Sequence, residues 1–284
     1  MIKPGFKLLS LFAIGLTLSL GSLTADSVPD VSPVQSTANP LGLQTVGPVN
    51  LAGSDFRSAS FLTNLPNIMS YIDDHRDLLG RYRPPTNSRI DPNGLSWNTD
   101  MDVRVYFVDE SSILHNSIGH TTNSDFSLNW GDEKLIFPDA STNGSTRTNS
   151  WPGSLGTPVL PGDFVELGTI PAWTPLDFFA IPNGGAQAGH EQNITLTYWT
   201  DPDQNSLGDP VQHFFTVNPI PGTDYLLYAL EDLPFGAFGD YDDVFFIVEA
   251  VATPEPETYL ILGAFLLMVI AIRGKEPLKA RVKI

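Results

Sequence analysis

The chain has 284 residues, with 15 Lys and Arg against 32 Asp and Glu, and it contains no cysteine. A formal net charge of −17 argues against nucleic acid as a partner, and the lack of cysteine excludes a disulfide framework, thiolate metal sites and cysteine nucleophiles. The 24 glycines and 24 prolines favour a β-rich fold with many turns over a helical one.

The acidic character is concentrated in the middle of the chain. Seven of the 15 basic residues and three of the 32 acidic residues lie in the two end segments, so residues 26–253 carry a formal net charge near −21. Such a surface is suited to divalent cations, or simply to solubility.

Residues 1–25 have the pattern of a secretory signal peptide. Lys3 and Lys7 form a positive start, an apolar run covers residues 8–20, and Leu23-Thr24-Ala25 resembles a cleavage site for signal peptidase. The alternative to a signal peptide is an N-terminal membrane anchor, but the apolar run is short for one. We therefore expect export through the Sec machinery.

Residues 26–95 are expected to form an extension ahead of the main domain. Residues 27–53 are rich in Ser, Pro, Thr, Asn and Gln, which is typical of a linker. Residues 61–79 carry apolar residues at a helical spacing despite Pro66, so they predict a short helix.

Four arginines follow closely on this helix: Arg76, Arg81, Arg83 and Arg89. They would contact an anion or a polysaccharide, or pair with nearby carboxylates, among them Asp73, Asp74, Asp77 and Asp91.

Residues 96–252 predict an all-β domain, either a β-sandwich or a jelly-roll-like fold. Short segments of β-branched, aromatic and alternating residues are separated by turns rich in Pro and Gly. The expected strands lie at 103–108, 130–137, 164–170, 176–185, 194–200, 211–215 and 244–248.

The loop at residues 201–209 places oxygen-bearing side chains at intervals that resemble a calcium loop. These are Asp201, Asp203, Asn205 and Asp209. Ser206 stands where an EF-hand needs glycine, Gln212 stands where it needs glutamate, and the flanks read as strands, so we reject an EF-hand. A cation-binding hairpin loop remains, with a plain turn held by Asp and Asn side chains as the alternative.

Residues 230–250 hold the densest acidic cluster beside an apolar strand. The five carboxylates are those of Glu231, Asp232, Asp240, Asp242 and Asp243, with no basic residue in the same stretch. Clustered carboxylates repel one another unless water, donors or a hard cation relieve them, and Ca²⁺ is the natural cation for an all-oxygen site. The alternative is a solvated acidic turn.

Several segments resemble the DUF 4114 family of exported bacterial proteins. The order EDL, a Gly-rich spacer, GDYDD and an apolar strand is similar to the family's end, with Asp240, Tyr241, Asp242 and Asp243 at its core. Further similar positions are Glu110, Asn116, Ser117, Ile118, Gly119, the segment LDFFAIPNGG at 176–185, and His213. The resemblance implies an exported domain and no particular activity.

Residues 253–284 form a tail of a different kind. Pro254, Glu255 and Pro256 precede an apolar run at 259–272, which predicts a short membrane helix, and five basic residues follow it. This order resembles the PEP-CTERM sorting signal, which implies transient contact with an exosortase and later release or attachment to extracellular polymer. An ordinary single-pass anchor is the alternative.

No motif of a hydrolase, a zinc enzyme or a nucleotide-binding loop is present in the sequence. We expect a non-enzymatic protein, anchored in the inner membrane before processing and then found at the cell surface or in the extracellular matrix. It would bind Ca²⁺ at the acidic loops, and polysaccharide through exposed aromatics such as Trp97, Trp151 or Trp173. The alternative is that each of these tryptophans belongs to the core. The alternatives are a secreted carbohydrate-active hydrolase and a passive structural surface protein.

Overall fold

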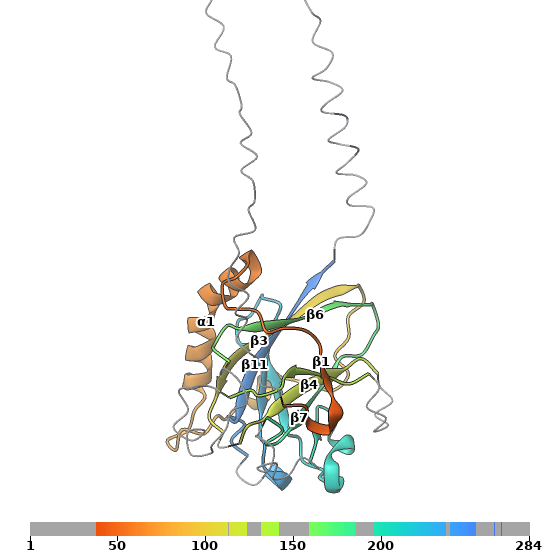
Figure 1. Ribbon diagram of the computed structural model, residues 1–284. Coiled ribbons are helices and arrows are strands. Elements are labelled where there is room, and N and C mark those ends of the chain that lie inside the picture. Colours follow the sequence, from red (N-terminus) through yellow and green to blue (C-terminus); the bar gives the residue numbers. More distant parts are fainter. Residues whose placement is uncertain are drawn as a thin grey trace, which may run out of the picture. The chain divides into compact units, whose positions relative to one another are not determined.

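The computed structural model describes residues 38–112, 114–123, 132–141, 159–185, 196–236, 239–253, 264 and 268. This part of the chain is mostly β-sheet, arranged in two sheets with one α-helix (Figure 1). The predicted all-β architecture with a short N-terminal helix is therefore confirmed at this level.

A five-stranded sheet has the order β1-β5-β4-β7-β8. Its strands are β1 (Gln44–Thr45), β4 (Ser117–Thr121), β5 (Lys134–Phe137), β7 (Asp177–Ile181) and β8 (Tyr198–Trp199). All neighbours are antiparallel except β1 and β5, which run parallel.

A six-stranded sheet has the order β2-β9-β10-β11-β3-β6 and is antiparallel throughout. Its strands are β2 (Arg89–Ile90), β3 (Met101–Glu110), β6 (Phe164–Ile170), β9 (Phe214–Val217), β10 (Tyr225–Leu230) and β11 (Val244–Ala252). Five short 3₁₀ turns lie in the described loops, at Pro40–Gly42, Thr86–Ser88, Pro202–Gln204, Ser206–Gly208 and Pro234–Gly236.

The main core lies between the two sheets. Val103, Val105 and Phe107 of β3 meet Ile118 of β4 and Phe178 of β7 there. Successive side chains of a strand point to opposite faces, so the alternation in β3 sends Tyr106 and Val108 to the second core, beneath the helix.

The strand β11 is buried on both faces, as its continuous apolar sequence predicts. Val244, Phe246 and Val248 face the core between the sheets. Phe245 and Ile247 face the helix. The strand pairs with β10 on one side and β3 on the other, so its start and the acidic residues before it are fixed in place.

The helix α1 (Phe56–Asp74) packs on the outer face of the six-stranded sheet (Figure 1). Phe61, Ile68 and Ile72 are its fully buried apolar side chains, and the Phe61 ring stacks on Tyr106 with centroids 3.9 Å apart. The helix begins and ends five residues earlier than the periodicity of 61–79 predicts. Its start is set by a capping box between Asp55 and Ser58.

Part of the predicted linker belongs to the sandwich. Strand β1 pairs with β5, and Asn50 forms a β-bridge with Phe164. The described segments thus belong to one compact unit, within residues 32–284.

Gly119 shows why one strand position in the five-stranded sheet excludes a side chain. A Cβ there would collide with the Phe179 ring and with the Lys134 carbonyl oxygen. The glycine allows Phe179 to pack over the outer face of β4 beside Trp199.

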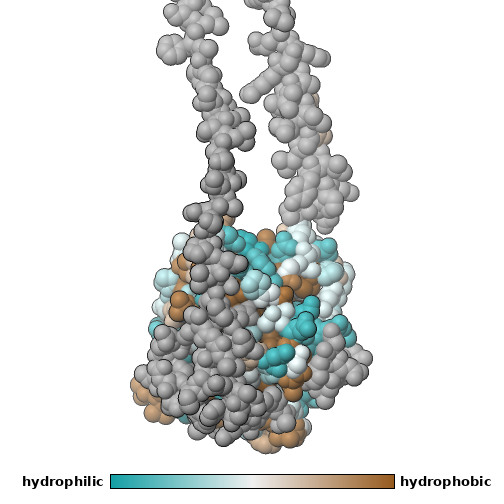
Figure 2. All heavy atoms as spheres, in the orientation of Figure 1, coloured by the Kyte–Doolittle hydropathy of each residue, from teal (hydrophilic) through white to brown (hydrophobic). Residues whose placement is uncertain are grey.

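The surface is mixed on the face shown in Figure 2, where hydrophilic and hydrophobic residues are interspersed. Among the described residues, no helix is both long and apolar enough to cross a membrane.

Candidate metal centre

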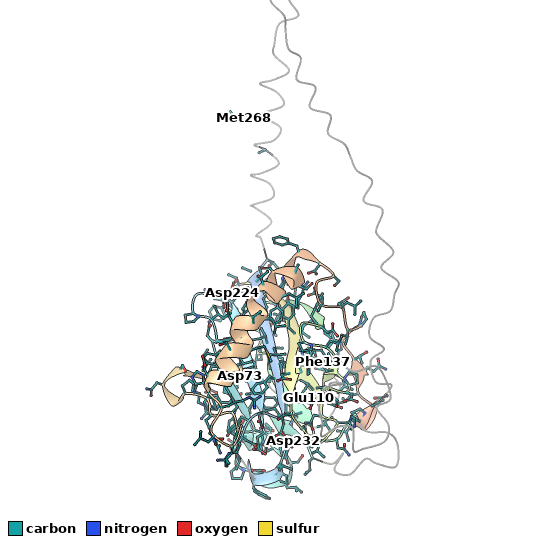
Figure 3. The ribbon with its side chains drawn as sticks, turned by 90° about the vertical axis from the view of Figure 1, so that its left-hand side faces the viewer. Asp73, Glu110, Phe137, Asp224, Asp232 and Met268 are labelled. Carbon is teal, nitrogen blue, oxygen red and sulfur yellow. The ribbon has the colours of Figure 1, made fainter. Side chains whose placement is uncertain are left out.

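The acidic residues gather where three strands of the six-stranded sheet end. Leu230 at the end of β10 pairs with Val244 at the start of β11, and Val244 pairs with Glu110 at the end of β3. The loops that follow β10 and β3 therefore share one end of the sandwich. In Figure 3, Asp232 lies at this end, whereas Asp224, just before β10, lies at the opposite end.

Three carboxylates converge at this place, and we call them the carboxylate trio. Glu231, Asp240 and Asp243 each offer one ligand oxygen, and these oxygens lie within 4.8 Å of one another. The backbone N–H of Asp240 donates to Glu231 Oε2 at 3.0 Å, which folds the intervening loop back onto its own start. Gly239 and Tyr241 both have positive φ, at 54° and 45°, so the turn around Asp240 is tight.

The trio carries negative charge in a partly desolvated place. Burial, reinforced by the charge of Asp240, raises the pKa of Glu231 to about 7. Burial, together with the charges of Asp232, Glu231 and Asp240, raises the pKa of Asp243 well above its usual range. Protons or a cation are the two ways to relieve this repulsion.

Asp232 forms the inner wall of the cluster. It is 2% exposed, and its Oδ2 accepts hydrogen bonds from Asn116 Nδ2, at 2.6 Å, and from the Ser112 hydroxyl. Its backbone N–H donates to Asp243 Oδ2 at 2.7 Å, so it connects directly to the trio. Burial raises the pKa of Asp232 as well.

Asp242 points to a different partner. Arg76, just after α1, donates from Nη1 to Asp242 Oδ2 at 2.8 Å. The Ser111 hydroxyl donates to the Asp242 backbone oxygen at 2.8 Å. The tertiary fold thus supplies a basic partner that residues 230–250 lack, and the carboxylate of Asp242 is engaged outside the trio.

The oxygen-bearing residues of the 201–209 loop hold the loop itself. Asp201 Oδ1 accepts from the Asp203 N–H at 3.0 Å. Asn205 accepts from the Trp199 N–H and donates to the carbonyl oxygens of Asp209 and Val211. These contacts match the alternative of a turn held by Asp and Asn side chains.

Asp209 links that loop to the acidic end of the six-stranded sheet. Its Oδ1 accepts from the Val211 N–H at 3.0 Å, and its Oδ2 accepts from the Phe235 N–H. His213 lies beside it, with Nε2 3.2 Å from Asp209 Oδ2 and Nδ1 2.6 Å from the Glu231 backbone oxygen. Asp209 therefore holds the loop next to the trio rather than joining it.

Residues from three separate segments meet at this end of the fold. Asn116 bonds Asp232, and its Oδ1 accepts from the Asn183 N–H at 3.4 Å. Asn183 in turn accepts from the His115 N–H at 3.3 Å. Segments that are distant in the sequence therefore build one polar network between the ends of the two sheets.

Sequence reasoning did not single out Ser112, which bonds Asp232, for this site. Ser112 lies in the loop after β3. A hydroxyl two residues after a strand that ends in Glu110 is a weak signal, because only the strand order reveals that β3 ends beside β10 and β11.

The arginines after α1 mostly pair with carboxylates. Arg81 and Arg83 both contact Asp77, at 2.8 and 3.5 Å, and Arg76 contacts Asp73 at 3.5 Å. Arg89 instead lies over the Phe215 ring, 4.9 Å from its centroid.

The tryptophans named above differ in exposure. Trp173 is 74% exposed, on a turn where its φ is 63°. Trp97 is partly buried against the main core. Trp151 lies outside the described residues, as do the predicted signal peptide and the motif Pro254, Glu255 and Pro256.

Chemically, the trio is suited to a hard cation. Its three carboxylate oxygens lie within 4.8 Å of one another, and Ca²⁺ takes clustered oxygen ligands. Among the described residues, these three side chains form the group able to hold a metal ion.

In comparisons with protein families, with curated proteins and with solved structures, the chain finds no match.

Proposed function

We propose that this chain is an exported, non-enzymatic cell-surface or extracellular matrix protein that binds Ca²⁺ at the carboxylate trio. The observation that carries the proposal is the convergence of Glu231, Asp240 and Asp243, with ligand oxygens within 4.8 Å of one another. Ca²⁺ takes six to eight oxygen ligands, including waters and backbone carbonyls. Three carboxylates, with Asp232 as an inner fourth, would supply the charged part of such a shell.

The electrostatics support a cation over a solvated turn. A turn in free solvent would leave its carboxyl groups near their usual pKa. Here burial and mutual repulsion raise the pKa of Glu231 to about 7 and that of Asp243 well above its usual range. A divalent cation would remove the repulsion that this arrangement otherwise carries.

The proposed export and sorting rest on the sequences of the two ends of the chain. The predicted signal peptide at residues 1–25 supports export by the Sec machinery. The Pro254-Glu255-Pro256 motif, the apolar run and the basic end support a PEP-CTERM signal and transient processing by an exosortase. Ala264 and Met268, the two described residues of the apolar run, are both helical.

The proposed metal centre is tested by calcium titration of the purified chain. We expect saturable heat in calorimetry and a rise in melting temperature on going from chelator to millimolar Ca²⁺. Asp240→Asn should abolish both effects. The matched control is Asp224→Asn, because Asp224 is exposed and lies just before β10, at the opposite end of the fold from the trio. Equal titration curves for the two variants, or no binding by the unaltered chain, would refute the proposal.

The proposed export and sorting are tested by fractionating cells that make the chain with and without residues 254–284. The unaltered chain should be found first in the inner membrane and then at the surface or in the medium, in a form shortened near Pro254. Persistence of the full-length chain in the membrane would support an ordinary anchor instead.

A contact with polysaccharide is a secondary part of this proposal. Trp173 is the described tryptophan that is mostly exposed, and aromatic faces are common platforms for ring-shaped ligands. Binding of extracted matrix polymer to the unaltered chain, with loss in Trp173→Ala, is the expected result.

A further inference from the structure

Tyr198 presents a buried hydroxyl that has no hydrogen-bond partner among the described residues. Its side chain lies in β8, at the edge of the five-stranded sheet, and the residue is 1% exposed. Buried polar groups are almost always hydrogen-bonded to protein, water or a ligand. The hydroxyl of Tyr198 therefore indicates a partner beyond the described side chains.

The ring of Tyr198 is held beside the acidic end of the other sheet. It stacks on His213, with ring centroids 3.6 Å apart and an interplanar angle of 7°. His213 Nδ1 lies 2.6 Å from the backbone oxygen of Glu231, which is a member of the trio. His213 thus contacts both the Tyr198 ring and the backbone of Glu231.

The charged groups that act on the phenol are carboxylates at this end of the fold. Burial, reinforced by the negative charges of Asp209, Asp232 and Glu231, raises the pKa of Tyr198. The phenol therefore keeps its proton at neutral pH and acts as a donor. Such a donor suits an acceptor oxygen such as that of a water molecule.

We propose that Tyr198 completes the cation site from the opposite sheet, by donating its hydroxyl hydrogen bond to a water molecule bound to the ion. This inference rests on the proposed calcium function and adds a positioning residue to it. A neutral phenol is a poor direct ligand beside three carboxylates, whereas Ca²⁺ commonly keeps waters among its six to eight ligands. Groups that orient a metal's ligands from outside its coordination shell contribute strongly to affinity.

The arrangement would also connect the two sheets through the ion. The trio and Asp232 belong to loops of the six-stranded sheet, whereas Tyr198 belongs to β8 of the five-stranded sheet. Calcium binding would then tie the edge strand β8 to the β10–β11 loop through one water.

The first test is calcium calorimetry on the full chain with Tyr198→Phe, which removes one oxygen atom and keeps the ring. We expect affinity for Ca²⁺ to fall by about 10-fold, as for other groups that orient metal ligands. The matched control is Tyr228→Phe, because Tyr228 is equally buried, in β10, and faces the core between the sheets. It should bind Ca²⁺ as the unaltered chain does.

The outcomes separate this inference from the function on which it rests. If the unaltered chain binds Ca²⁺ and Tyr198→Phe binds equally well, Tyr198 plays no part and the inference is wrong, while the metal centre stands. An equal loss in Tyr198→Phe and Tyr228→Phe would show a general effect of core hydroxyls and would also overturn it. If the unaltered chain binds no Ca²⁺, both proposals fail.

A second measurement reads the phenol directly in the unaltered chain. With [¹³Cζ]tyrosine, the eight tyrosines give separate NMR signals, and the Tyr198 signal is the one missing from Tyr198→Phe. Calcium should shift this signal and leave that of Tyr228 unchanged, since only the first hydroxyl gains a ligand water. An unmoved Tyr198 signal at saturating Ca²⁺ would contradict the proposal.

Discussion

At the scale of single residues, the chemistry of the acidic cluster depends on which carboxylates the fold desolvates. The sequence places five carboxylates in residues 230–250 and does not show which of them are buried or paired. The structure separates them, because Asp242 pairs with Arg76 while Asp232 receives Ser112 and Asn116. These partners come from the segment after α1 and from the β3–β4 loop, so their contacts depend on tertiary packing that local sequence patterns do not contain.

Calcium affinity should depend on pH because protons compete for the trio. The pKa of Glu231 is raised to about 7 from 4.5, and that of Asp243 is also raised. At pH 5.5 Glu231 holds a proton that Ca²⁺ must displace, whereas at pH 8 Glu231 is mostly ionised. We expect affinity at least about 10-fold higher at pH 8, measured by calorimetry in matched buffers. Equal affinities at the two pH values would contradict the raised pKa of Glu231.

Without calcium, the same groups should give the opposite trend in stability. A carboxyl group whose pKa is raised by folding binds more protons in the folded state than in the unfolded state between pH 4.5 and 7. Its contribution to the free energy of unfolding is therefore lost as pH rises through that window. Urea unfolding of the chelated chain should show this loss in the unaltered protein and a smaller loss in Glu231→Gln.

His120 should make the fold sensitive to acid. Both its ring nitrogens are buried without a hydrogen-bond partner among the described residues, and burial, with the charge of Lys134, lowers its pKa to about 4 from 6.5. Because the folded state resists protonation, stability falls as pH drops from 6.5 towards 4. The shift corresponds to about 3 kcal/mol at most. His120→Phe should remove this part of the pH dependence of urea unfolding, and parallel profiles for both chains would argue against it.

At the scale of elements, the helix and most strands follow from local pattern, but their ends and partners do not. The apolar spacing that includes Phe61, Ile68 and Ile72 predicts the buried face of α1 correctly. The start of the helix is set by the capping box of Asp55 and Ser58, which apolar periodicity does not detect. Strand β11 was predictable because a strand buried on both faces leaves a continuous apolar run, whereas the two-residue β1 depends on its pairing with β5.

The cap of α1 also anchors the helix to the sheet, so Asp55→Ala should be strongly destabilising. The buried Arg104 of β3 donates to Asp55 Oδ1 and Oδ2, at 3.0 and 2.7 Å, and also contacts Glu166 of β6. Removing Asp55 deletes the cap and one of the two carboxylates that compensate a buried guanidinium. We expect a loss of about 2–4 kcal/mol in the free energy of unfolding, measured in urea.

The matched control for this change is Asp74→Ala at the other end of α1. Asp74 is exposed and lies at the C-terminal end of the helix, where a negative charge is unfavourable to the helix dipole. Its removal should leave stability unchanged or slightly raised. If Asp55→Ala costs no more than the about 1 kcal/mol expected from loss of a helix cap alone, the contact of Asp55 with Arg104 adds nothing to the fold.

At the scale of the whole molecule, the fold class was predictable and the arrangement of the loops was not. Frequent Gly and Pro with short alternating strands indicate a sandwich. The strand order β2-β9-β10-β11-β3-β6 decides that the loops after β3 and β10 meet, and no local pattern specifies that order. This is why the sequence yields a list of candidate calcium ligands and the structure brings three of them together.

The net charge of −17 should destabilise the chain by self-repulsion, in a way that differs from the effect of the metal centre. Monovalent salt screens charges over the whole surface, so raising NaCl from about 20 to about 500 mM should raise the melting temperature of the chelated chain. Asp240→Asn should show nearly the same rise, because it changes one charge of many.

Calcium at saturation should act differently in a constant background of about 500 mM NaCl, where general screening is already complete. Ligand at about 100 times its dissociation constant stabilises the folded state by about 2.7 kcal/mol, which corresponds to a rise of about 5–11 °C for a domain of this size. Mg²⁺ at the same concentration should give a smaller rise, because it needs a tighter octahedral shell than a loop-built carboxylate cluster provides. A calcium effect that disappears in high salt, or that Asp240→Asn retains, would identify non-specific screening of an acidic surface rather than a bound ion.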